Sequence, residues 1–176
     1  MQSMASLLSL CLFLVALQQK ADPYAHSSLL AYYQTATKDE GIARKFITLM
    51  DNYQGRDPLK LGYKAVSHAI MAKHVWSPYA KMKYLRQSSQ IFEEAVALDK
   101  HDPEVRFLRF SIENYIPRYL NMSNNLAEDK KVFMAAIMRH PRSGISSETV
   151  KIMRDFLVRK DLLTKQEQQQ MEKINL

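Results

Sequence analysis

The amino-acid sequence predicts an all-α protein in which helical hairpins pack antiparallel in one domain behind an N-terminal signal segment. Only 4 of the 176 residues are glycine, whereas tight β-hairpins and phosphate-binding loops depend on glycine at positive φ. No window alternates apolar and polar residues for long enough to predict a strand. Helix-start signals recur along the chain instead, and we expect about seven helices.

The chain begins with an uncharged apolar segment from Met4 to Leu17, and its first basic side chain is Lys20. The segment is shorter than the roughly 20 residues that span a bilayer and fits a signal-peptide core of roughly 7–15 residues. We therefore expect residues 1–21 to be a signal peptide and residues 22–176 to be the domain. The mature protein is then exported to the periplasm or the cell envelope.

Three alternatives remain for this segment. In the first alternative, Cys11 is the lipidated residue of a lipoprotein, although Leu10 stands where that processing favours a small side chain. In the second, the segment is a buried first helix. In the third, it stays uncleaved and associates with the membrane. Cleavage removes the only cysteine, which excludes disulfides, thiolate zinc sites and a cysteine nucleophile.

Helix starts are marked in order along the rest of the chain. The first is a capping box at Thr37 and Glu40. Three helices then begin with a polar N-cap followed by proline, at Asp57-Pro58, Ser77-Pro78 and Asp102-Pro103.

The C-terminal third continues in the same manner. Asn124 or Asn125 caps one helix, Ser146 or Ser147 caps the next, and Thr164 forms a second capping box with Glu167. Pro117 predicts a kink or break near Tyr115, and Pro141 ends a helix.

One helix–turn–helix junction resembles a tetratricopeptide repeat. Phe92, Ala95, Leu98 and Asp99 match that family in residue type and spacing, although Lys100 replaces the usual proline. The resemblance implies degenerate, tetratricopeptide-like packing rather than a repeat array, because no 34-residue period recurs. Residues 76–79, 104–110 and 115–120 also resemble small exported bacterial helical proteins of unassigned function, which supports export and a helical fold.

The net charge is +7 and the isoelectric point is about 9.4. In the body of the chain the basic residues are spread from Lys38 to Lys173 and are interleaved with acidic ones. This distribution is typical of a solvated helical surface, so we expect no nucleic-acid partner.

No motif predicts a catalytic, metal-binding or cofactor-binding site. The five histidines form no H-E-x-x-H pattern, and His68 and His74 point to different sides of a helix. The pairs Glu93-Glu94 and Glu128-Asp129 diverge by about 100° on a helix, and we expect them on solvated faces.

A cluster of arginine and aromatic residues is the candidate partner-binding site, because such side chains often anchor interfaces. Its members are Arg106, Arg109, Arg118, Trp76 and Tyr79. The alternative for the first two is a structural Arg–Glu network between helices. The alternative for Trp76 is a packing wedge between helices.

These observations favour a non-enzymatic exported module that binds a protein or peptide partner. The first alternative is a carrier of a small ligand, a lipid or pigment, in a cavity between helices. The second is an enzyme whose site is assembled from dispersed Glu, His and Arg side chains.

Overall fold

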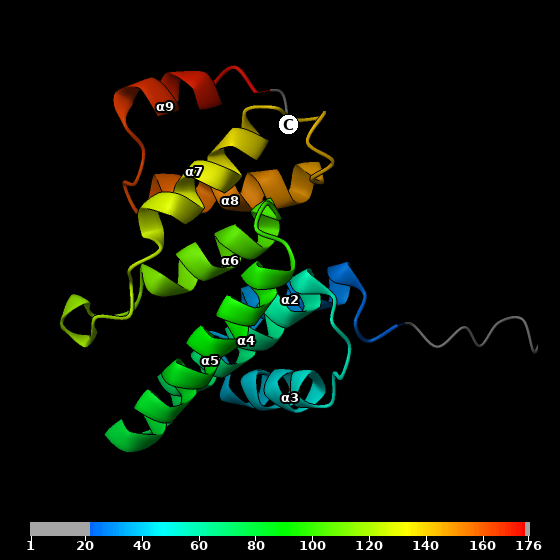
Figure 1. Cartoon of the computed structure of the whole chain (residues 1–176), viewed down its shortest axis with the longest axis vertical. Coiled ribbons are helices and arrows are strands. Elements are labelled where there is room, and N and C mark those ends of the chain that lie inside the picture. The colour runs from blue at the N-terminus through cyan, green and yellow to red at the C-terminus, as the bar shows by residue number, and fades with distance from the viewer. Residues whose placement is uncertain (1–21, 175–176) are drawn as a thin grey trace, which may run out of the picture.

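The computed structural model describes residues 22–174, so the predicted signal peptide and the alternatives for Cys11 lie outside the described residues. Within this range the chain forms eight α-helices, one 3₁₀ helix and no strand, which confirms the all-α class (Figure 1). The elements are α2 (His26–Thr35), α3 (Glu40–Asp51), α4 (Pro58–His74), α5 (Pro78–Leu98), α6 (Pro103–Glu113), η1 (Arg118–Leu120), α7 (Leu126–Ile137), α8 (Ser147–Arg159) and α9 (Lys165–Met171). No helix between residues 22 and 174 is both long and apolar enough to cross a bilayer.

Polar caps determine where most of these helices begin, as the sequence predicts. Asp57, Ser77 and Asp102 each accept a hydrogen bond from a backbone N–H of the first turn, and proline follows each of them. The Thr164–Glu167 capping box is present. Proline suits this position because the first helical N–H has no partner within the helix.

Two details of the N-terminal part differ from prediction. No sequence signal predicts α2, because Ala25 precedes it and offers no side-chain cap. The capping box at Thr37 is wrong: α3 begins at Glu40, and the carboxylate of Asp39 accepts a hydrogen bond from the N–H of Ile42 at 2.8 Å. Asp39 lies nearer the apolar stripe, and aspartate caps a helix better than threonine does.

Successive helices pack antiparallel, with α4 against α3 and α5 and then α6 against α5. The first hydrophobic core is formed by helices α2, α3, α4 and α5 and includes Phe46, Tyr63 and Phe92. The second is formed by helices α6, α7, α8 and α9 and includes Phe133 and Phe156. Figure 1 shows α6 between these two groups of helices.

Helix α6 belongs to both cores because apolar residues lie on more than one of its faces. Leu108 belongs to the first core, whereas Phe107 and Phe110 belong to the second. Both phenylalanine rings form T-shaped pairs with the Phe133 ring, with centroids 5.5 and 5.1 Å apart, an arrangement that aromatic pairs prefer. The arginines of α6 are consequently buried with it.

Candidate functional site

Arg106 and Arg109 form a buried ion network with Asp129 of α7. Arg106 Nη1 donates to Asp129 Oδ1 at 2.8 Å, and Arg109 donates to both carboxylate oxygens at 2.7 Å. The side chains of Arg106 and Arg109 are 4% and 7% exposed, and that of Asp129 is 0% exposed. Arg106 also bonds to the carbonyl of Lys100 and to Glu128, so both guanidinium groups are paired.

This arrangement corrects the prediction that Asp129 is solvated. It also decides between a binding groove and a structural network for Arg106 and Arg109. Asp129 does not lie on a solvated face, because α7 packs it against α6, whereas Glu93 and Glu94 are exposed as predicted. Arg106 and Arg109 belong to the structural network rather than to an open groove. Removing one member of such a network leaves a buried charge without a partner, so these residues fix α7 on α6.

The same two helices hold both ends of the segment between them, residues 114–125, which we call the tyrosine loop. The Glu113 carboxylate accepts hydrogen bonds from the side chain and the backbone N–H of Asn125, at 2.7 and 3.0 Å. The Ser123 hydroxyl donates to the Glu113 carbonyl at 2.9 Å. Burial raises the pKa of Glu113, and the two bonds from Asn125 oppose that rise.

The inner side of the tyrosine loop packs against the body of the protein. Ile116 and Met122 line a crevice with Leu85 and Phe92 of α5, and its volume is only about 10 Å³, the space of roughly one water molecule. The helix interruption predicted at Pro117 is a full break, since α6 ends at Glu113 and η1 begins at Arg118.

The outer side of the tyrosine loop carries exposed aromatic and basic side chains. Tyr119 is 85% exposed and Tyr115 is 64% exposed, and Arg118 is also exposed. The ammonium group of Lys160 lies 3.8 Å from the centroid of the Tyr115 ring, a cation–π contact. In Figure 1 the loop projects from the body between α6 and α7.

Trp76 and Tyr79 lie elsewhere, where α4 turns into α5. They are 96% and 82% exposed, so the prediction that Trp76 is a packing wedge is wrong. Ser77 and Pro78 begin α5 immediately after Trp76, and this sharp turn directs the indole away from both helices. Of the five predicted residues, Arg118, Trp76 and Tyr79 are exposed on two different elements, whereas Arg106 and Arg109 are buried.

Three of the histidines lie close to a polar group on another part of the chain. His68 lies 2.9 Å from Asp51, His74 bonds to the carbonyl of Ala36 at 2.9 Å, and His26 lies 3.0 Å from Glu104. Burial raises the pKa of Glu104, and the nearby His26 opposes the rise. Among residues 22–174, no three His, Cys, Asp or Glu side chains are grouped to hold a metal ion.

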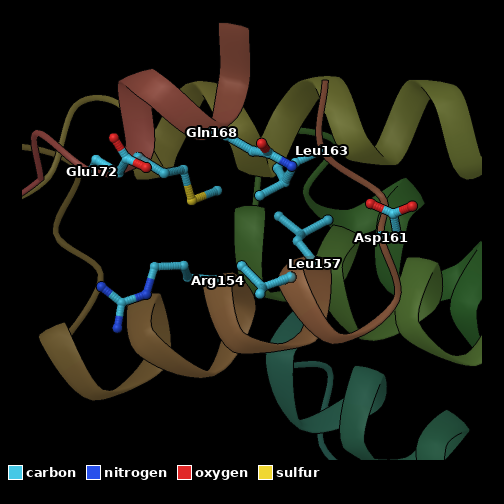
Figure 2. A pocket seen from close by; sticks show the side chains of 8 residues that line it. Arg154, Leu157, Asp161, Leu163, Gln168 and Glu172 are labelled. Carbon is cyan, nitrogen blue, oxygen red and sulfur yellow. The ribbon is translucent and has the colours of Figure 1, made fainter. Parts of the chain in front are cut away.

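A half-open pocket of about 370 Å³ lies between α8 and α9. Figure 2 shows Leu157 and Leu163 near its centre, with Arg154 and Glu172 toward one end and Asp161 toward the other. Its volume is at the lower end of the range for small-molecule sites, roughly 300–1,000 Å³. Both apolar and charged side chains line the pocket.

Sequence reasoning missed Tyr119, Glu113 and Asn125 as parts of a built loop. Pro117 signalled the break in the helix, but only the folded chain shows that Glu113 and Asn125 meet. The chain matches no protein-family model, no curated protein and no solved structure.

Proposed function

We propose that the chain is a non-enzymatic, exported helical module that binds a protein or peptide partner through the tyrosine loop. The observation that supports this most directly is a projecting loop that presents Arg118 and Tyr119 while its base is held by buried hydrogen bonds. Tyrosine and arginine are among the residues that contribute most to binding at protein interfaces.

The fixed conformation of the loop also favours binding. A segment that is already ordered loses less conformational freedom when a partner associates. Asn125, Ser123 and the packed Ile116 order the tyrosine loop before any partner arrives. Its exposed side is then available for contact without rearrangement of its base.

The helical architecture is compatible with a degenerate, tetratricopeptide-like module. Phe92 is buried in the first core, and Ala95 packs with Leu61 of α4 and Val105 of α6. We take these contacts as support for a tetratricopeptide-like junction between α5 and α6. We place the module in the periplasm or the cell envelope on the basis of the apolar N-terminal segment.

Photo-crosslinking from the loop tests the proposal. A benzoylphenylalanine at position 119, in protein produced in its own host, should form a discrete adduct with a polypeptide on irradiation. Adding Arg118→Ala should abolish that adduct, because the guanidinium group contributes to the same contact. A circular dichroism spectrum should show that the variant remains helical.

Position 151 provides the control, since Lys151 is exposed on α8, away from the loop in the sequence. The same photoreactive residue there should give no adduct. Equal adducts from both positions, or none from position 119, would refute binding through the loop.

A second candidate function rests on the α8–α9 pocket. Apolar Leu157 and Met171, together with the polar ends of the pocket, would suit a small amphipathic ligand. The chain would then be a small-ligand carrier. Native mass spectrometry of protein purified from its own host separates the two, because a carrier would retain a small molecule and a binding module a polypeptide.

A further inference from the structure

The turn between α4 and α5 exposes two aromatic side chains almost fully. We call residues 75–79 the aromatic tip. Trp76 is 96% exposed and Tyr79 is 82% exposed, although aromatic side chains of this size usually bury 150–250 Å². In Figure 1 the start of α5 lies at the lower edge of the molecule, beyond α3. Both rings can therefore contact a surface that the helices themselves do not enter.

The α4–α5 hairpin is also strongly basic. Residues 58–92 contain six lysine and arginine residues and no aspartate or glutamate. Lys81, Lys83 and Arg86 follow the aromatic tip on α5 and are exposed. No carboxylate of residues 22–174 forms an ion pair with these three, so their charges are available to an external anion.

Not every nearby cation is available in this way. Lys73, in the last turn of α4, donates to the carbonyl of Thr37 at 2.7 Å. The nearest acidic residue of α5 is Glu93, ten positions after Lys83 and hence about 15 Å along the helix axis. The positive charge beside the tip is thus carried by the first part of α5.

We propose that the aromatic tip docks on the surface of a bilayer that contains anionic phospholipids. Tryptophan and tyrosine concentrate at membrane–water interfaces, because their rings are apolar and their N–H or O–H groups remain hydrated. Basic residues beside such anchors are attracted to anionic headgroups. This inference goes beyond the proposed partner binding, which uses a different element.

The end of a hairpin suits a bilayer better than it suits an acidic polypeptide. Interface hot spots usually lie near the centre of a patch and are enclosed by surrounding contacts. Trp76 instead stands at a turn, and Ser77 and Pro78 beside it are exposed as well. Insertion into the headgroup region needs no surrounding protein rim.

The single tryptophan of the chain makes the proposal directly measurable. We expect Trp76 fluorescence to shift to shorter wavelength, and acrylamide quenching to fall, when phosphatidylcholine vesicles containing phosphatidylglycerol are added to the full chain. Pure phosphatidylcholine vesicles should have a much smaller effect, because they lack the anionic charge. The N-terminal apolar segment is the same in every variant, and its binding alone would not move the Trp76 signal.

Charge reversal beside the tip should weaken vesicle binding, measured by co-sedimentation, by roughly a hundredfold. The variant is Lys81→Glu/Lys83→Glu/Arg86→Glu. Its matched control is Lys131→Glu/Lys151→Glu/Lys165→Glu, which changes the net charge equally at exposed positions of α7, α8 and α9. We expect the control to bind within a few-fold of the unmodified chain.

Replacement of the rings tests the anchor itself. Trp76→Ala/Tyr79→Ala should weaken co-sedimentation at least roughly tenfold, whereas Tyr119→Ala, at a similarly exposed position, should not. An unchanged Trp76 signal with anionic vesicles would overturn the proposal and leave an acidic polypeptide as the occupant. Equal losses in the two triple variants, or in Tyr119→Ala, would overturn the assignment to the tip.

Discussion

At the scale of single residues, the buried carboxylate of Asp129 determines how two arginines of the neighbouring helix are used. A solvated arginine can approach a partner, whereas a buried guanidinium group paired with a carboxylate contributes to the fold. Arg106 and Arg109 are of the second kind. The sequence predicts their shared helix face from the i, i+3 spacing. It cannot predict that Asp129 turns inward while adjacent Glu128 stays 67% exposed, because that depends on how α7 rotates on α6.

Replacing Asp129 should therefore be far more destabilising than replacing Glu128. We expect Asp129→Ala to lower the free energy of unfolding by about 3–5 kcal/mol, because two buried guanidinium groups lose their carboxylate. Glu128→Ala should lower it by less than about 1 kcal/mol, as is usual for an exposed ion pair. Urea denaturation followed by circular dichroism measures both, and similar values would show that Asp129 is not the centre of the network.

At the scale of elements, capping side chains predicted most helix starts, although Thr37 was predicted as the cap of α3 where Asp39 has that role. Asp57, Ser77 and Asp102 act as predicted because a cap depends only on neighbouring backbone. Helix α2 was missed because Ala25 provides no such signal. The tyrosine loop was predicted only as an interruption at Pro117, since its order depends on contacts between residues twelve positions apart.

The loop should lose its order when its half-buried anchor, Asn125, is removed. Asn125→Ala deletes the 2.7 Å hydrogen bond to the Glu113 carboxylate, and an unsatisfied buried group costs about 1–3 kcal/mol. We expect faster amide hydrogen exchange across residues 114–124 by mass spectrometry, with little change in α4. Asn124→Ala is the control, because Asn124 is exposed and donates only a 3.4 Å bond to Asn121; equal exchange in both variants would mean that the anchor does not order the loop.

At the scale of the whole molecule, α6 connects two hydrophobic cores through residues on different faces. The N-cap signal at Asp102-Pro103 predicts that a helix begins here. It does not indicate which residues of the helix face which neighbour. Apolar side chains lie on several sides of this short helix, so no single apolar stripe marks one buried face. Leu108 contacts the first core and Phe110 the second. The two groups of helices are thus joined through α6, and Tyr33 of α2 also packs against the second core.

This coupling predicts cooperative unfolding of the two cores. Phe110→Ala should lower the free energy of unfolding by about 3–5 kcal/mol, because it leaves a cavity beside Phe133 and Phe156. Since α6 must then separate from both groups, we expect amide protection to fall in α4 of the first core as well as in α7 and α8. Hydrogen exchange with mass spectrometry at several denaturant concentrations distinguishes the outcomes. If protection fell only in α7 and α8 while α4 kept the protection of the unmodified chain, the cores would be independent units and α6 would not couple them.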